Sequence, residues 1–270
     1  MNKSQIAIFC IWLTLLFPAM VVAANKPTKS NSRKEWKLIW KEEFKGKKLD
    51  TKSWSRYTQN GGSDWDRHMS GLDSLCRVEN GVLQLWGINT HKGYNDNRPF
   101  LTGGVGSKGL RSVKNGRIEV RARYDCGEGF WPAIWLMPDI NIRHPYGGEI
   151  DIMEHLNYDD IAFQTVHTPH TLFKHEPSIQ NYVMVSIDKA QFNTYAVEVN
   201  NSEITFYING KKTFSYKKME PQIEGQYPFN DFAYYIILSA QLGGSWVGNV
   251  NPKDLPVKME IDYVKFYERR

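Results

Sequence analysis

Three Asn-Gly dipeptides, each lying between alternating or apolar segments, constrain the fold of this chain more than any other feature. They are Asn80-Gly81, Asn115-Gly116 and Asn209-Gly210. Both central residues of a type I′ turn need a positive φ, which Asn and Gly adopt readily, so each pair predicts a two-residue β-hairpin. The chain is therefore expected to consist of antiparallel strands.

Alternation of apolar and polar residues marks the strands themselves. Residues 118–124 place Ile, Val, Ala and Tyr on one face and charged residues on the other, and residues 204–208 and 259–263 follow the same period. This period of two is typical of half-buried antiparallel strands. Beyond the first two dozen residues, no segment keeps a helical period over three turns. We therefore predict an all-β fold, an antiparallel two-sheet β-sandwich with one concave outer face that forms a cleft for a polymer.

The N-terminal region has the pattern of a cleaved signal peptide over residues 1–24. Lys3 is its one charged residue, an apolar run over residues 6–22 follows, and Ala23 and Ala24 precede a polar segment. A retained membrane helix is the alternative, but the apolar run is short and ends in small residues. We expect an exported protein, periplasmic or extracellular, that has no membrane contact after cleavage.

Residues 25–34 are predicted to be a basic polar linker. Residues 35–270 are predicted to form a single catalytic domain, since all-β sandwiches often reach this size as one unit. The formal net charge of +5 comes from Lys3 and four basic residues of the linker, which leaves residues 35–270 neutral. A neutral domain argues against a nucleic-acid partner. The sequence shows no surface for a protein partner, so we expect a monomer.

Two cysteines and three tryptophans are candidates for the interior of the domain. Export makes a disulfide between Cys76 and Cys126 feasible, but their spacing does not decide between a bridge and two separately buried thiols. Without a Cys-x-x-Cys pair, a structural zinc site is not expected. Trp36, Trp40 and Trp54 are expected to be core residues.

Residues 149–154 put three carboxylates into an otherwise apolar, β-prone stretch: Glu149, Asp151 and Glu154. Burying charge is costly unless the charge is used. In a regular strand Glu149 and Asp151 share one face, while Glu154 falls on the other. A β-bulge inserts one residue and restores the parity, and bulges are frequent beside active sites. We predict a bulge near residues 152–153 that turns all three acids onto one surface.

Three neighbouring acids cannot all ionise cheaply, so at least one is expected to have a raised pKa. This arrangement suits a neutral general acid beside an ionised nucleophile. Retaining glycosidases hold two carboxyl groups about 5 to 5.5 Å apart and inverting ones roughly 6.5 to 9.5 Å apart, and the spacing of Glu149 and Glu154 favours retention. Asp151 lies between them and is expected to hydrogen-bond one of them and orient it.

Three alternatives remain open for these acids. They could solubilise an exposed strand face, build a metal site, or belong to a sandwich that binds carbohydrate without cleaving it. A metal site would use oxygen and imidazole ligands, which suit several ions, from Glu149, Asp151, Glu154, His155 and His167. Clustered charge disfavours the binding-only sandwich, because neutral sugars are recognised by amides, hydroxyls and stacked rings.

Aromatic and polar side chains around the acids are candidate substrate contacts. Trp131 and Trp135 share one face of the segment before the acids, and Trp rings can stack on the apolar faces of pyranoses. Gln241 and Trp246 flank a glycine-rich loop suited to the edge of a groove. His167 either returns on the adjacent strand to the cleft floor or is a hydrogen-bonded structural histidine.

Five ordered segments resemble glycoside hydrolase family 16 and together cover nearly all of the domain. They are residues 43–54, residues 131–135, residues 149–154 in the bulged Glu-x-Asp-x-x-Glu form, residues 243–246 and residues 260–264. The resemblance implies a β-jelly-roll sandwich that hydrolyses an oligo- or polysaccharide at internal β-linkages with retention. It implies Glu149 as the nucleophile, Glu154 as general acid and then base, and Asp151 as the carboxylate that assists Glu149.

The resemblance implies that catalysis requires no cofactor. Family members often carry a structural calcium ion on the convex side, where Glu43 and Asp262 correspond to ligand positions. Such an ion would stabilise the fold without taking part in the reaction.

The surroundings of the acids imply the substrate. Residues 61–70 depart from the Asn-Glu-Leu-Gln-Tyr-Tyr-like stretch of many β-1,3-glucanases and are more similar to endo-β-galactosidases that act on O-glycans and poly-N-acetyllactosamine. This resemblance adds Trp65, His68, His155 and Asn157 to the expected substrate contacts. We expect cleavage of internal β-1,4-galactosidic bonds. An endo-β-1,3- or mixed-linkage glucanase is the first alternative, and action on sulfated or other galactans is the second.

Overall fold

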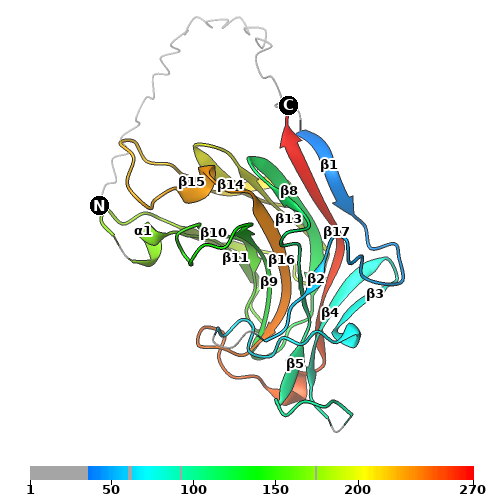
Figure 1. The fold of residues 1–270 in the computed structure, drawn as a ribbon. Coiled ribbons are helices and arrows are strands. Elements are labelled where there is room, and N and C mark those ends of the chain that lie inside the picture. The colour runs from blue at the N-terminus through cyan, green and yellow to red at the C-terminus, as the bar shows by residue number, and fades with distance from the viewer. Residues whose placement is uncertain (1–35, 60–62, 92, 174) are drawn as a thin grey trace, which may run out of the picture. The chain divides into compact units, whose positions relative to one another are not determined.

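A computed structural model of the chain describes residues 36–270 apart from 60–62, 92 and 174 (Figure 1). The predicted signal peptide and basic linker lie outside the described residues. The described residues all belong to one compact unit. Within them, no helix combines the length and the apolar character needed to cross a membrane.

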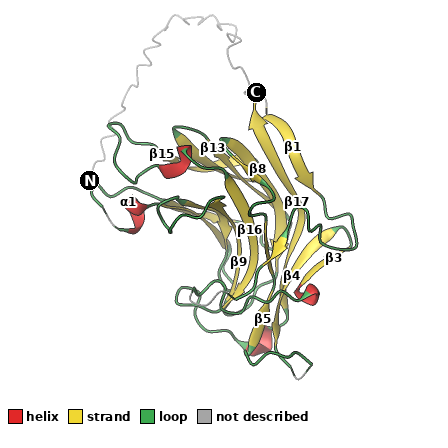
Figure 2. Ribbon diagram, in the orientation of Figure 1, coloured by secondary structure: helices red, strands yellow, loops and turns green. Residues whose placement is uncertain are grey.

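Two antiparallel sheets make up the domain, and Figure 2 shows them as two layers of strands with only short helical segments around them. The nine-stranded sheet has the order β15 (Lys211–Lys217), β14 (Glu203–Ile208), β13 (Asn193–Val199), β8 (Gly116–Tyr124), β17 (Val257–Arg269), β4 (Val82–Asn89) and β3 (Cys76–Glu79), with β1 (Trp36–Glu42) beside β17 and β5 (Phe100–Thr102) beside β4. The eight-stranded sheet has the order β12 (Tyr182–Ser186), β11 (Ile161–His167), β10 (Glu149–Glu154), β9 (Phe130–Pro138), β16 (Tyr234–Leu242), β6 (Gly104–Gly106) and β2 (Ser55–Arg56), with β7 (Ser112–Val113) beside β16. The helical segments are α1 (Pro169–Leu172) and three 3₁₀ turns, η1 (Asp73–Leu75), η2 (Pro228–Asn230) and η3 (Pro252–Asp254). The predicted all-β sandwich is confirmed.

Two of the three Asn-Gly dipeptides form the predicted hairpins. Asn80-Gly81 joins β3 to β4, Asn209-Gly210 joins β14 to β15, and all four residues have positive φ. Asn115-Gly116 instead connects β7 in one sheet to β8 in the other, so the prediction of a hairpin there is wrong. Gly116 is required for space, because a Cβ atom on it would lie 2.4 Å from the Val113 side chain and 2.5 Å from the Tyr267 carbonyl oxygen.

The hydrophobic core lies between the two sheets. In β8 the residues alternate as predicted, with Ile118, Val120 and Ala122 buried against the other sheet and Glu119 and Arg121 on the outer face. Each fully buried aliphatic or aromatic side chain contributes about 1.5–3 kcal/mol to stability. This burial on one face of each sheet leaves the other face of the eight-stranded sheet free to carry a site.

The tryptophans and cysteines assigned to the interior differ in their burial. Trp54 is fully buried in the core and Trp40 packs against it, whereas Trp36 is only half-buried at the edge of the sheet, where β1 pairs with the end of β17. Trp36 is therefore not a core residue, contrary to the prediction. Cys76 and Cys126 are separate free thiols, which resolves the alternative that their spacing left open.

Candidate active site

Strand β10 contains the predicted bulge. Against β9, Asp151 pairs with Trp135 and Met153 pairs with Ile134, so that Ile152 has no partner of its own. Ile152 and Met153 are both fully buried in the core. Two consecutive inward-facing residues bring Glu154 back to the face of Glu149 and Asp151, as predicted. The three acids of β10 consequently line one cavity on the outer face of the sheet.

A cleft crosses this face of the eight-stranded sheet, whose strands β9 and β16 bend along their length in Figure 1. It consists of two cavities of about 390 Å³ and 530 Å³. The first extends over β9 and β16 and the second over β11 and β12, and both are lined by Trp131, Glu149 and Glu154. The acids therefore lie where the two cavities meet, with room for a ligand on either side.

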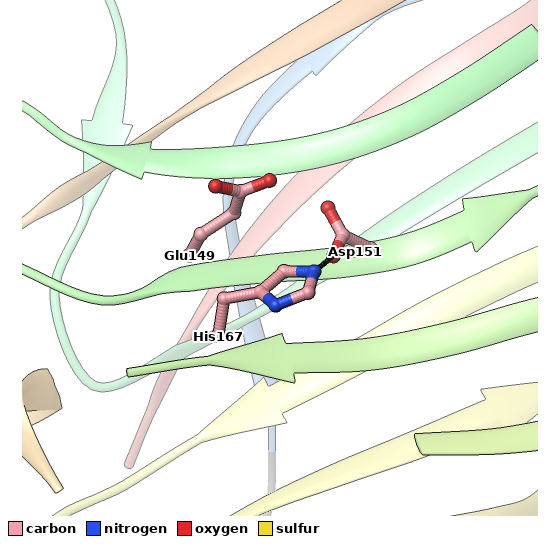
Figure 3. Close-up of side chains that lie close together, drawn as sticks. All are labelled: Glu149, Asp151 and His167. Carbon is pink, nitrogen blue, oxygen red and sulfur yellow. Dashed lines mark ion pairs between the residues drawn. The ribbon is translucent and has the colours of Figure 1, made fainter. Parts of the chain in front are cut away.

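Each of the three acids contacts a different polar side chain. His144 Nε2 lies 2.7 Å from Glu149 Oε2. His167 Nε2 lies 3.3 Å from Asp151 Oδ2, the contact that Figure 3 marks with a dashed line. The indole N–H of Trp131 donates to Glu154 Oε1 over 3.0 Å.

These partners give the acids different pKa values. Burial opposes ionisation of Glu149, but the hydrogen bond from His144, the charges of His167 and His144, and a hydrogen bond with Asp151 together hold its pKa below the usual value. Burial and the neighbouring Glu149 raise the pKa of Asp151 well above its usual value. Burial, and then the charges of Asp151 and Glu149, raise the pKa of Glu154 likewise. The cluster therefore holds one ionised carboxylate beside protonated ones.

Glu149, Asp151 and His167 also offer oxygen and nitrogen atoms within 4.8 Å of one another, a spacing that a metal ion could use. Figure 3 shows the three side chains reaching into the same space from β10 and β11. Within this set, Glu149 Oε2 contacts His144 and Asp151 Oδ2 forms an ion pair with His167. His155, which the metal alternative also required, does not reach this space.

The two residues expected to bind calcium lie in ion pairs at the surface. The Glu43 carboxylate accepts hydrogen bonds from Lys41 and Lys45 through Oε2 at 3.0 and 2.9 Å, and these bonds lower its pKa to about 2. Asp262 Oδ2 pairs with Arg121 at 2.5 Å. A structural calcium ion at these residues stays a prediction.

Aromatic rings form the walls of the cleft on both sides of the acids. Trp246 is 46% exposed and packs edge-on against Trp131, with ring centroids 5.4 Å apart. On the other side, Trp65 packs edge-on against Trp135 at 5.0 Å. Trp135 is largely buried and donates its indole N–H to Ser239 Oγ, so it forms the cleft floor rather than an exposed platform.

Gln241 and His167 lie in the cleft, as the sequence predicts. Gln241 lines the first cavity, donates through Nε2 to Ser239 Oγ, and has a buried Oε1 that finds no hydrogen-bond partner among the described residues. That oxygen is available to a ligand hydroxyl. His167 lines the second cavity.

Three residues predicted to contact the substrate, His155, Asn157 and His68, lie outside the cleft, so these predictions are wrong. His155 is fully buried beneath it, where its ring nitrogens lie 3.0 and 3.2 Å from the backbone carbonyls of Ile161 and Asn157. The side chain of Asn157 is occupied in accepting from Gly129 N and donating to Val247 O, which supports the loop that carries Trp246. His68 lines a separate cavity behind that loop.

Sequence reasoning missed His144, Tyr57 and Tyr235, which all line the first cavity. His144 lies in the connection between β9 and β10, which carries no periodic pattern. Tyr57 follows the short strand β2, and Tyr235 lies within the very apolar strand β16, where every residue is buried. Only the pairing of β16 with β9, which the sequence does not reveal, brings Tyr235 beside the acids.

Comparison with known proteins agrees with this geometry. Residues 73–265 match the family model described as glycosyl hydrolases family 16. The chain is 31% identical over 238 residues to the keratan-sulfate endo-1,4-beta-galactosidase of Sphingobacterium multivorum; the match covers 87% of this chain and spans 56% of the length of that relative.

Solved structures share the fold. The laminarinase from Rhodothermus marinus superposes with a TM-score of 0.79 at 27% identity, covering 87% of this chain and 98% of the other. A structure described as "Prominent members of the human gut microbiota express endo-acting O-glycanases to initiate mucin breakdown" superposes with a TM-score of 0.74 at 30% identity, covering 87% of this chain and 100% of the other. Because the family model spans most of the two-sheet domain, including the bulged strand and its three acids, the chain belongs to glycosyl hydrolases family 16.

Proposed function

We propose that this protein is an exported, retaining endo-β-glycosidase that acts on host-type galactose-containing glycans. The observation that carries the catalytic part is that Glu149 and Glu154 line the same cleft and that their surroundings shift their pKa values in opposite directions. A pair of titratable groups whose environments push their pKa values apart is the arrangement that an acid and a nucleophile need. The chain's own side chains supply both groups.

In the proposed reaction, the ionised Glu149 attacks the anomeric carbon of the sugar bound in one cavity. Glu154 gives its proton to the departing glycosidic oxygen, so the C–O bond breaks as the glycosyl–Glu149 ester forms. Glu154, now ionised, takes a proton from a water molecule that attacks the anomeric carbon and releases Glu149. Two inversions leave the product with the configuration of the substrate.

Asp151 and Trp131 support the two steps. Asp151 hydrogen-bonds Glu149 and limits the negative charge that gathers in the cluster. The Trp131 N–H holds Glu154 Oε1 and stabilises the carboxylate that appears when the proton leaves. Cavities on both sides of the acids allow sugars to bind on both sides of the cleaved bond, which supports endo action.

For the substrate, we propose β-1,4-galactosidic bonds within O-glycan and poly-N-acetyllactosamine chains. Similarity to the keratan-sulfate endo-1,4-beta-galactosidase and to the structure described for O-glycanases supports this choice. Similarity to the laminarinase from Rhodothermus marinus supports an endo-β-1,3- or mixed-linkage glucanase as the second candidate.

A digestion panel tests the substrate directly. The purified protein is incubated with mucin O-glycans, keratan, laminarin and mixed-linkage glucan, and product sizes and linkages are determined by mass spectrometry. We expect oligosaccharides from the galactose-containing glycans. Release from the glucans alone would replace the first candidate by the second.

The same panel tests the type of reaction. NMR spectra recorded early in the digestion are expected to show the β-anomer of the new reducing end, and an initial α-anomer would contradict retention. Oligomers rather than single sugars are expected for endo action. Binding of a glycan without cleavage of any substrate would instead indicate a carbohydrate-binding sandwich.

A further inference from the structure

His144 is a cleft residue whose place in the reaction no sequence motif indicates. It belongs to the connection of residues 139–148, and its side chain is 43% exposed. Its Nε2 atom is 2.7 Å from Glu149 Oε2, the shortest of the three contacts between an acid of β10 and its partner. His144 therefore contacts the proposed nucleophile from the open side of the cleft.

The end of this connection is fixed in place by close packing. Gly148 has φ +72°, and a Cβ atom on it would lie 2.5 Å from the ring of Phe229. The carbonyl of the preceding Gly147 accepts a hydrogen bond from Tyr234. These contacts anchor the chain directly before Glu149, at the end of the connection that places His144 at the cavity.

We infer that His144 is a positioning residue, which holds one oxygen of Glu149 and leaves the other oxygen directed at the sugar. The inference rests on the proposed function and adds to it. His167 and Trp131, the partners of the other acids, stand on the paired strands β11 and β9, whereas His144 stands on a connection. The orientation of Glu149 thus depends on a residue that the sheet itself does not place.

The groups facing Glu149 come from three strands as well as from this connection. They are Asp151 and Glu154 of β10, His167 of β11 and Tyr235 of β16. The hydrogen bond with Asp151 and the charges of His144 and His167 favour the ionised form of Glu149. Loss of His144 therefore leaves Glu149 with fewer groups that favour its ionised form, and the pKa of Glu149 should rise.

The test compares His144→Ala with His144→Gln, which keeps a side-chain N–H donor but does not titrate. The substrate is whichever glycan of the panel the wild-type protein cleaves, and kcat and KM are measured across pH. We expect His144→Ala to lower kcat by about 10- to 100-fold, because a nucleophile displaced by a fraction of an ångström attacks poorly. KM should change much less.

The acid limb of the kcat/KM profile should move to higher pH in His144→Ala, while the alkaline limb, set by Glu154, stays in place. His144→Gln should recover part of kcat. His91→Ala, at an exposed histidine outside the cleft, is the matched control and should behave as wild type.

An acid limb that stays in place in His144→Ala, or a loss confined to KM, would overturn the positioning role. Failure of the proposed function looks different, because the wild-type protein itself would then release no oligosaccharides or would release the inverted anomer. Circular dichroism of each variant confirms folding, and the exposure of His144 makes a folded His144→Gln the expected result.

Discussion

Carboxylates on the two sheets of this domain have opposite environments. On the outer face of the nine-stranded sheet, Glu260 contacts Arg123 at 2.6 Å and Lys258 at 2.9 Å, and these cations outweigh its burial and lower its pKa. In the cleft of the eight-stranded sheet, Glu154 accepts a hydrogen bond from the neutral N–H of Trp131, and its pKa is raised. Both acids are less than a tenth exposed, so burial alone does not explain the difference.

The pattern extends to the other acids of each face. Outer-face acids pair with arginines. Glu198 with Arg117 and Asp262 with Arg121 join neighbouring strands, and Glu119 pairs with Arg117 along β8. Among the described residues that line the two cleft cavities, none is Lys or Arg. The outer face therefore pairs its carboxylates with Arg and Lys, whereas the cleft offers histidines and an indole N–H, which leave the pKa values of Asp151 and Glu154 raised.

The strongest test of this comparison removes one acid from each face. Glu149→Gln and Glu154→Gln should each lower kcat on natural glycans by about 10⁴-fold, because one variant lacks the nucleophile and the other the acid. Glu260→Gln should keep turnover within about twofold of wild type, since it lies on the outer face. Steady-state assays of reducing ends measure all three.

Azide separates the two cleft acids. With an activated substrate, Glu154→Gln should still form the glycosyl–enzyme, and azide should then yield a β-glycosyl azide. No such adduct is expected from Glu149→Gln. A β-glycosyl azide from the Glu149 variant would contradict its role as nucleophile, and its absence from the Glu154 variant would contradict the acid/base role of Glu154.

A smaller effect is expected when the single donor to Glu154 is removed. Trp131→Phe keeps a ring in the cleft but loses the N–H that lowers the pKa of Glu154. The alkaline limb of the pH profile should therefore move to higher pH, and kcat should fall by about 10- to 100-fold. Trp246→Phe, which keeps a ring against Trp131, should leave that limb in place.

The smallest expected effect is on stability, and it has opposite signs on the two faces. Glu154 has a raised pKa in the folded protein, so stability is lost as pH rises from its ordinary pKa of 4.5 through the folded value. Above that window, Glu154→Gln should raise Tm, by about 2–4 °C for each kcal/mol gained.

Glu260 has a lowered pKa in the folded protein. Its contribution to stability is therefore present above its ordinary pKa and is lost as pH falls through the folded value. Glu260→Gln should lower Tm at neutral pH and have little effect in strong acid. Thermal unfolding followed by circular dichroism measures both variants, and equal signs for the two would contradict the contrast between the faces.

Features that depend on neighbouring positions in the chain could be predicted from the sequence. The strand period of two predicts the sandwich, and the parity of the acids in β10 predicts the bulge, because both follow from local backbone geometry. The same kind of reasoning failed at Asn115-Gly116. There only Asn115 has a positive φ, and Gly116 is needed because Val113 and Tyr267 approach it closely.

His155 directly follows the outward-facing Glu154, so the strand period itself turns it inward against Tyr124, and the expected ligand contact was wrong. Features that depend on tertiary contacts could not be predicted from any such pattern. His144 contacts Glu149 although the connection that carries it has no periodic pattern, so the sequence did not indicate this contact. A residue that is next to a catalytic acid in the sequence therefore need not lie in the cleft, and a residue without any motif can lie there.

Because of the bulge, β10 can lose one residue, either Ile152 or Met153, and keep its acids on one face. Ile152 and Met153 both face the core, so a deletion of either codon would leave acids and apolar residues in strict alternation, with all three carboxylates still outward. A deletion of Ile150 would instead make Glu149 and Asp151 adjacent and turn one of them into the core. Among single-residue deletions that keep all three acids, those of Ile152 or Met153 therefore leave the acids on one face, and that of Ile150 does not.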